Sequence, residues 1–219
     1  MTRDFLVAFS HYDQYLSGLW NTLWLSAATL LLASIAGCVV AALMLARQKV
    51  VRLPAAWLVD GMRCIPFLLF AYLIYYGLPE VSLRLDSWAS GLIALVVYHA
   101  AYMAEIIRGA WTNLSREQIE AGRAFGFAGF PLFGRIILPQ LFFASVPLIG
   151  NQSIYILKDT AFLMIITVPE LTFAASSVQS TYFVPFASFV IAMLLYWLVT
   201  LGIEASVKRV ELAAEVRRG

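Results

Sequence analysis

Polar and ionisable side chains interrupt the apolar stretches of this chain, and their chemistry needs an explanation. These residues are His99, Tyr102, Glu105, Asn151, Gln152, Lys158, Asp159 and Thr160. An ionisable group inside a membrane costs roughly 2.5–3.5 kcal/mol on insertion scales, so each one suggests a function. A lysine can bind a carboxylate and an aspartate can bind an ammonium group, which are the two ends of a zwitterion. We therefore expect these side chains to line a polar path for a small solute.

Helix geometry places this polar set near the middle of a membrane. His99 precedes Arg108 by nine residues, which is about 13 Å along a helix and close to the centre of a ~30 Å hydrocarbon core. Counted from Pro139, Gln152 rises about 20 Å and reaches a similar depth. Residues of two separate helices are therefore expected at one level.

Structural pairing is the alternative interpretation for part of the set. Glu105 can pair with Arg108 three residues later instead of facing a solute. Lys158 can pair with Asp159 or extend toward the head groups. His99 fits either a path residue or a satisfied core histidine. Unchanged uptake affinity after replacing His99 with Leu would remove it from the path.

Enzymatic and nucleic-acid functions find no support in the sequence. It contains no His-Glu-x-x-His or Gly-x-Ser-x-Gly motif, and its apolar stretches hold no paired carboxylates. Two histidines, His11 and His99, are too few for most metal sites. The net charge is only +2, and no basic run has interleaved aromatic residues. We expect no enzyme, no bound metal and no nucleic-acid partner.

The composition predicts an all-α integral membrane protein. Hydrophobic residues make up 62% of the chain, charged residues 13%, and the mean hydropathy is +0.82. Because about 20 apolar residues cross a bilayer as a helix, the uncharged runs predict five spans within one transmembrane domain over residues 1–219. The expected spans are 18–46, 62–77, 88–107, 139–157 and 183–205, with a polar loop over 109–138 and a re-entrant or surface-lying segment over 158–182.

The distribution of basic residues predicts which side each loop faces. Loops after spans one, three and five hold most of them, whereas the opposite side holds only Arg3 and Arg84. Cytoplasmic loops are enriched in Lys and Arg, so the N-terminus is expected outside and the C-terminus in the cytoplasm. The cytoplasmic set is Arg47, Lys49, Arg52, Arg108, Arg116, Arg123, Arg135, Lys208, Arg209, Arg217 and Arg218.

The polar loop over 109–138 has the composition of a short, rigid helix on the cytoplasmic face. A helix is expected from Glu117 to Phe125, because acidic residues suit the positive end of the helix dipole. Gly126 can adopt the left-handed conformation that ends a helix. The apolar side chains of Phe125, Phe127 and Phe130 are expected to enter a pocket of a partner.

The same loop resembles the cytoplasmic EAA loop of ABC-importer permeases. It reads Glu120-Ala121-Gly122, then Gly126, and then Ile136-x-Leu138-Pro139 at the family's spacings, with Gly122 in place of the third small residue. Other segments resemble those of polar amino-acid permeases. They are Arg63-Cys64-Ile65-Pro66 with Tyr76-Gly77-Leu78-Pro79, Ala101 to Gly109, and Leu157-Lys158-Asp159-Thr160-Ala161 with Pro169-Glu170-Leu171. Cys64, Ile65 and Ala161 replace the family's Gly, Thr and Ser, which removes hydroxyl groups from any substrate contact there.

The resemblance implies a type I permease subunit of a polar amino-acid ABC importer in the bacterial cytoplasmic (inner) membrane. Its implied partners are two cytoplasmic ATPase subunits, a second permease subunit that is identical or related, and an extracytoplasmic substrate-binding protein. The chain lacks a Gly-x4-Gly-Lys-Ser/Thr loop, so ATP and magnesium are expected on the ATPase subunits, and this chain is expected to need no cofactor. The residues expected to dock the ATPase are Glu117, Glu120, Ala121, Gly122, Phe125, Gly126 and Phe127.

An ATP-independent channel or secondary carrier for small polar solutes is the alternative function. The sequence has no convincing internal repeat, which weighs against a carrier built from inverted repeats. The polar loop over 109–138, which is expected to dock an ATPase, also favours an ATP-driven pump over a channel or carrier. The solute itself stays open, since amino acids, opines and compatible solutes share the same charged ends.

Overall fold

The computed structural model describes residues 2–216 and the side chains of residues 2–212, and all regular structure within them is helical. The α-helices are α1 (Thr2–Ser10), α2 (Tyr12–Met44), α3 (Lys49–Cys64), α4 (Phe67–Tyr72), α5 (Ser87–Thr112), α6 (Arg116–Ala124), α7 (Gly129–Leu132), α8 (Leu138–Asp159), α9 (Leu171–Tyr182) and α10 (Pro185–Val216). Short π- or 3-10 helices are η1 (Leu73–Gly77), η2 (Leu78–Val81), η3 (Phe133–Ile137) and η4 (Thr160–Ile166). Arg217 and Arg218 of the charge count lie outside the described residues.

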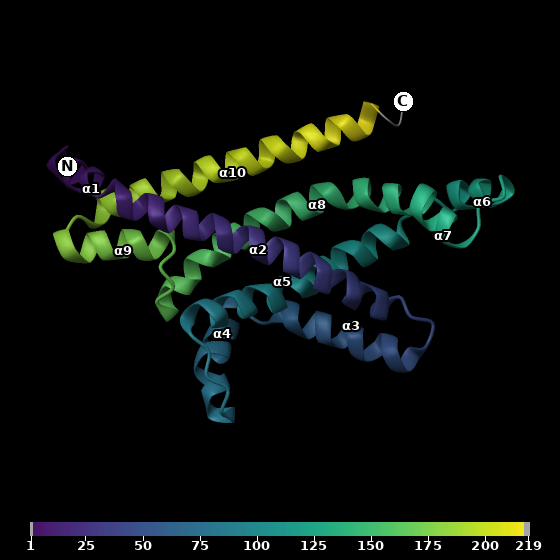
Figure 1. Ribbon diagram of the computed structural model, residues 1–219, viewed down its shortest axis with the longest axis horizontal. Coiled ribbons are helices and arrows are strands. Elements are labelled where there is room, and N and C mark those ends of the chain that lie inside the picture. The colour runs from purple at the N-terminus through teal and green to yellow at the C-terminus, as the bar shows by residue number, and fades with distance from the viewer. Residues whose placement is uncertain (1, 217–219) are drawn as a thin grey trace.

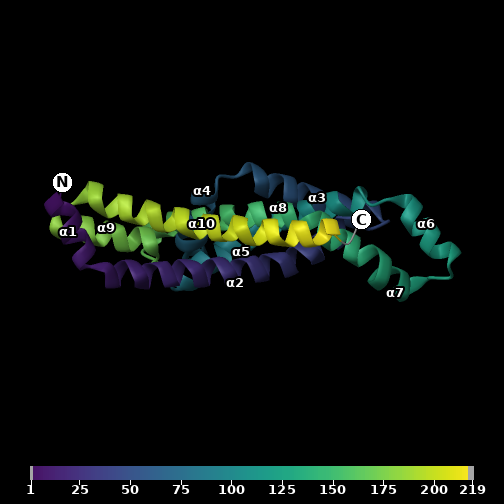
Figure 2. The same cartoon turned by 90° about the horizontal axis from the view of Figure 1, so that it is seen from above.

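The long helices run side by side and separate two ends of the molecule. Figures 1 and 2 show α1 and α9 near one end of the long axis and α6 and α7 at the other. The C-terminal part of α10 and the connection between α2 and α3 lie toward the α6 end. The segment from α4 to η2 projects away from the main bundle (Figure 1). The N-terminal segment and the polar loop over 109–138 are therefore far apart.

The bundle is held by small and weakly polar residues, as expected for helices that associate within lipid. The buried residues of α2 recur every three or four positions, and they are Tyr15, Gly18, Thr22, Leu25, Thr29, Ala33, Gly37, Ala41 and Met44. Most of this stripe lies against α5. A Cβ added at Gly37 would lie 2.5 Å from Cβ of Met103, so α2 and α5 approach too closely for any larger residue there.

Within residues 2–216, four helices are long and apolar enough to cross a membrane, or five if one bent pair counts as a span. The bent pair is Lys49–Cys64 and Phe67–Val81, which meet at 104°. The sequence predicts a single short helix over 62–77 instead. Pro66 explains the difference, because a proline disfavours helical backbone at the preceding residue, and Ile65 is extended with φ −87° and ψ 134°.

The segment over 158–182 continues α8 as η4, turns at Thr167 and forms α9. Thr167 has a left-handed backbone (φ 63°), and Glu170 then begins α9 as its N-cap. The expectation of a re-entrant or surface-lying segment stays a prediction. The last long helix, α10, begins at Pro185 and extends well past the expected end of span five.

Candidate functional site

A pocket of about 640 Å³ lies between α4, α5, α8 and η4. Aromatic rings form most of its walls, and one carboxylate and one imidazole supply its most polar groups. The lining residues are Pro66, Phe67, Leu68, Tyr98, His99, Tyr102, Gln152, Tyr155, Asp159 and Phe162. Four of the eight expected path residues, His99, Tyr102, Gln152 and Asp159, thus share one pocket.

His99 is fixed between the two helices that flank the pocket. Its side chain is buried (1% exposed), and Gln152 Nε2 lies 2.8 Å from its Nδ1. When the amide of Gln152 donates, Nδ1 is the acceptor and Nε2 carries the imidazole proton. Nε2 lies 3.4 Å from Asp159 Oδ2, without the geometry of a hydrogen bond. The histidine therefore presents a polar atom toward the aspartate.

Asp159 is the acidic group of the pocket. Its side chain is 19% exposed and lies at the end of α8, where η4 begins. The rings of Phe67, Tyr98 and Tyr102 are within 5.2–6.3 Å of one another or of His99. A carboxylate beside aromatic faces is suited to a cationic group, because both attract positive charge.

Tyr102 connects the pocket with the bend between α3 and α4. Its hydroxyl lies 3.2 Å from the hydroxyl of Tyr98 and donates a long hydrogen bond of 3.4 Å to the carbonyl of Arg63. The Arg63 guanidinium lies 5.6 Å from the centre of the Tyr102 ring. Arg63 thus forms a cation–π contact with this wall from the last turn of α3.

The other expected path residues lie elsewhere. Glu105 accepts two hydrogen bonds from Arg108, at 2.6 and 2.8 Å, which is the pairing left open by the sequence. Asn151 and Lys158 are exposed on α8, outside the lining of the pocket. Thr160 is buried and donates to the carbonyl of Leu157.

The aromatic lining is what the sequence reasoning missed. Phe67, Tyr98, Tyr155 and Phe162 were not expected at the site, although Tyr98 adjoins His99 and Phe67 follows Pro66. An apolar ring in an apolar segment gives no signal of its own. Only the packing of α4 and η4 against α5 shows which rings face the pocket.

Glu170 forms a second buried polar centre. Its carboxylate accepts hydrogen bonds of 2.7 Å from the backbone N–H groups of Thr172 and Phe173, and one of 2.8 Å from the hydroxyl of Tyr196. In chain order Glu170 follows the third candidate span, which ends at Ile166, and precedes the fourth, which begins at Pro185. Burial raises its pKa to about 7. The carboxylate thereby caps α9 and joins it to α10.

The start of α9 is also tied to α2. The side-chain amide of Asn21 donates to the carbonyl of Pro169, and the backbone N–H of Leu171 donates to the hydroxyl of Thr22. These bonds satisfy backbone groups that a helix start inside the bundle would otherwise leave unpaired.

The polar loop contains the short helix α6. The hydroxyl of Ser115 accepts a hydrogen bond from the backbone N–H of Gln118, and Gly126 has the left-handed backbone (φ 84°) that the sequence predicts after the helix. Glu117, Glu120, Ala121 and Phe125 are exposed, whereas Phe127 is half-buried. They all lie at the end of the molecule that Figure 1 labels α6.

Gly122 is the exposed helix's point of contact with the rest of the loop. A Cβ at this position would collide with Ile136 and lie 3.1 Å from Leu132. This explains why glycine replaces the third small residue of the expected pattern. Helix α6 is therefore packed on η3 and α7 instead of being a free loop.

Long apolar helices around a polar pocket define a helical membrane transport protein. Residues 30–214 match the family described as binding-protein-dependent transport system inner membrane component. The chain belongs to this family: it is the membrane subunit of an ABC importer and a multi-pass protein of the inner membrane. Members of this family are transporter permease subunits, not catalytic enzymes.

Individual relatives and solved structures agree with this family. The probable glutamine ABC transporter permease protein GlnM of Bacillus subtilis is 32% identical over 209 residues, which cover 94% of this chain and 95% of that protein. The nopaline transport system permease protein NocM of Agrobacterium fabrum is 32% identical over 207 residues, covering 90% and 86%. The crystal structure of an amino acid ABC transporter with histidines has a TM-score of 0.90 and 29% identity, covering 97% and 100%. The chain thus has the type I ABC permease fold.

Proposed function

We propose that this subunit forms half of the translocation path for a polar amino acid or a related zwitterion such as an opine. The names of relatives, which refer to glutamine, nopaline and amino acids, support this class of substrate. The single observation that carries the proposal is the pocket that joins Asp159 and His99 to aromatic walls. The ammonium group of the substrate binds at Asp159. There it exchanges contacts with water for contacts with a carboxylate and with the faces of aromatic rings.

The exposed face of α8 supports a path shared with a second subunit. Asn151, Tyr155 and Lys158 follow one another at four and three residues, so they lie on one side of the helix, and all three are exposed. An amide and an ammonium group facing lipid at this depth would be costly. A second permease subunit, identical or related, covers this face, and Lys158 is then available to the substrate carboxylate.

We also propose that the N-terminus faces the outside and the C-terminus the cytoplasm. The α6 end of the molecule includes the α2–α3 connection with Arg47, the start of α6 with Arg116, and the C-terminal part of α10 with Lys208. Basic residues at this end agree with the positive-inside rule for a cytoplasmic face. An extracytoplasmic binding protein would then deliver substrate at the opposite end.

Helix α6 is the proposed coupling helix, through which this subunit contacts the pair of cytoplasmic ATPase subunits. It is short, closely packed through Gly122, and presents Glu117, Glu120 and the ring of Phe125 to solvent. A rigid helix with an exposed ring can transmit the movement of a partner to the long helices on either side. ATP and magnesium bind those partner subunits in this proposal.

The test of the substrate path is uptake by the reconstituted transporter, with its ATPase and binding protein, of a panel of cationic, neutral and acidic amino acids. Asp159→Asn keeps the size of the side chain and removes its charge, and is expected to lower kcat/KM at least about tenfold. The matched control is Asp13→Asn, the same change at an exposed residue in the first turn of α2, outside the lining of the pocket. Equal loss in both variants, or none in either, would contradict the role of Asp159.

An ATP-independent channel or carrier is tested separately. Uptake should stop when the ATPase subunits are omitted, and the ATPase should no longer co-purify after Glu120→Arg. Uptake that persists without ATPase subunits would overturn the importer mechanism without bearing on which residues line the path.

A further inference from the structure

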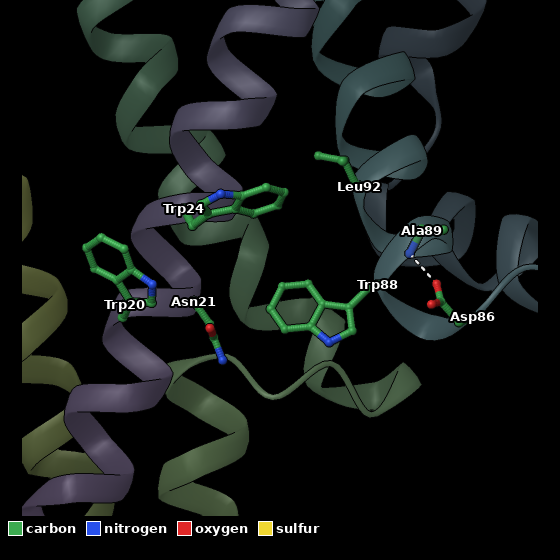
Figure 3. A pocket seen from close by; sticks show the side chains of 7 residues that line it. All are labelled: Trp20, Asn21, Trp24, Asp86, Trp88, Ala89 and Leu92. Carbon is green, nitrogen blue, oxygen red and sulfur yellow. Dashed lines mark hydrogen bonds between the residues drawn. The ribbon is translucent and has the colours of Figure 1, made fainter.

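A second pocket, which shares no lining residue with the proposed path, lies near the N-terminal end of α5. It has a volume of about 530 Å³ and is shallow and open at the surface. Its lining comes from two helices, with Trp20, Asn21 and Trp24 on α2 and Asp86, Trp88, Ala89 and Leu92 on or just before α5. Figure 3 shows Trp20 and Trp24 one turn apart on α2, with Trp88 projecting from α5 toward them.

The polar groups that line this pocket suit a cationic ligand. One oxygen of Asp86 accepts a 2.7 Å hydrogen bond from the backbone N–H of Ala89, and the other oxygen keeps its acceptor capacity (Figure 3). The amide nitrogen of Asn21 is used by the carbonyl of Pro169, which leaves the amide oxygen as an acceptor. No lysine or arginine is among the described lining residues. Indole faces attract cations more strongly than any other ring.

The ring geometry agrees with this. Trp24 and Trp88 lie with ring centres 6.4 Å apart at 80°, so one presents its edge and the other its face. Trp20 is 68% exposed and Trp24 51%, so a large part of each indole is accessible to a ligand.

The depth of the pocket indicates where its ligand comes from. Trp88 precedes His99 by eleven residues, or about 16 Å along α5, which is the half-thickness of a ~30 Å hydrocarbon core. The indoles therefore lie at the boundary between acyl chains and head groups, where tryptophan is enriched. Leu92 lies one helical turn deeper and continues the wall toward the membrane centre.

We propose that this pocket binds the ammonium head group of a zwitterionic phospholipid in the outer leaflet. The ammonium lies against the indoles of Trp24 and Trp88 and pairs with Asp86. The indole N–H groups are donors available to the lipid phosphate. The acyl chains follow the wall at Leu92. The bound lipid links the beginning of α5 to α2 on the side opposite the coupling helix.

The experiment uses the whole transporter, with its ATPase subunits, and native mass spectrometry. The probes are phosphatidylethanolamine and phosphatidylglycerol with the same acyl chains, which differ in the charge of the head group. The wild-type complex should retain phosphatidylethanolamine in preference. Asp86→Asn keeps an N-cap acceptor for α5 but removes the charge, and should lower the ratio of the two bound lipids about three- to tenfold. Trp88→Leu should lower it similarly.

The control is Trp197→Leu, which removes an exposed tryptophan of α10 and should leave the ratio unchanged. Equal retention of both lipids by the wild type would overturn the proposal. So would a ratio that is the same in Asp86→Asn and the control, as expected if a second permease subunit or the binding protein covers the pocket. Full displacement of the lipid by soluble glycerophosphoethanolamine at equal concentration would also overturn it. The pocket would then bind a soluble head group without any contribution from acyl chains.

Discussion

The side-chain amide of Gln152 lies 2.8 Å from Nδ1 of His99, although the two residues are 53 positions apart. This bond joins α8 to α5 at the wall of the pocket that contains Asp159. It also orients the imidazole so that Nε2 faces Asp159. A single amide thus links two long helices and orients a polar group of the site between them.

Loss of this amide should destabilise the protein. Gln152→Leu leaves Nδ1 of a buried histidine without a partner, at a cost of about 1–3 kcal/mol. Thermal unfolding in detergent should show a lower Tm, whereas Asn151→Leu, on the exposed face of the same turn, should not. An equal Tm for Gln152→Leu and the wild type would mean that the bond contributes nothing.

Replacement of His99 should act on substrate affinity. His99→Leu removes the polar atom that faces Asp159, and we expect a higher KM for uptake with a smaller change in kcat. Ser145→Ala, a buried change elsewhere on α8, is the control for altered packing. An unchanged KM would remove His99 from the path and leave it a structural residue.

The close approach of α2 and α5 predicts a large effect of a small substitution. Gly37→Ala places a Cβ 2.5 Å from that of Met103, so the helices must separate, at a cost of about 1–3 kcal/mol. Gly61→Ala in α3 is the matched control, because no atom lies within 4 Å of the added Cβ. Similar unfolding temperatures for both variants would show that α2 and α5 yield easily.

Glu170 should make stability depend on pH. Its pKa is raised from 4.5 to about 7 by burial, so the folded protein holds a proton between these values that the unfolded chain has lost. Stability should therefore fall as pH rises from about 4.5 to 7, by about 3 kcal/mol, and change little above that. Glu170→Gln should flatten this dependence in thermal unfolding measured across pH. The exposed Glu80→Gln should leave the curve intact, and an unaltered slope in Glu170→Gln would refute the assignment.

The exposed ring of α6 should matter for assembly but not for folding. Phe125 is 85% exposed, so Phe125→Ala should leave the Tm of this subunit nearly unchanged while reducing co-purification of the ATPase subunits. Phe183→Ala provides the comparison, since Phe183 is 87% exposed next to α9, at the other end of the molecule. Equal ATPase recovery from both variants would separate Phe125 from docking.

The sequence by itself predicted those features that depend on a single segment of the chain. Uncharged runs long enough to cross a bilayer marked α2, α5, α8 and α10, because burial in lipid requires an apolar side chain at almost every position. Likewise, Ser115 and Gly126 marked the ends of α6, since capping is decided by neighbours within a few residues. Motif order was sufficient to indicate the family.

Only the tertiary structure decided which polar residues meet. Gln152 and Asn151 are adjacent in sequence, but a step of 100° around α8 turns one toward His99 and leaves the other exposed. The sequence allowed Glu105 either to face a solute or to pair with Arg108, and the structure shows the hydrogen bond from Arg108 to its carboxylate. The bend at Pro66 brings Phe67 to the pocket, and no periodicity within one helix can report a contact between two. The sequence determined the long helices and the class of transport protein, whereas the packing of the helices determined which residues form the site.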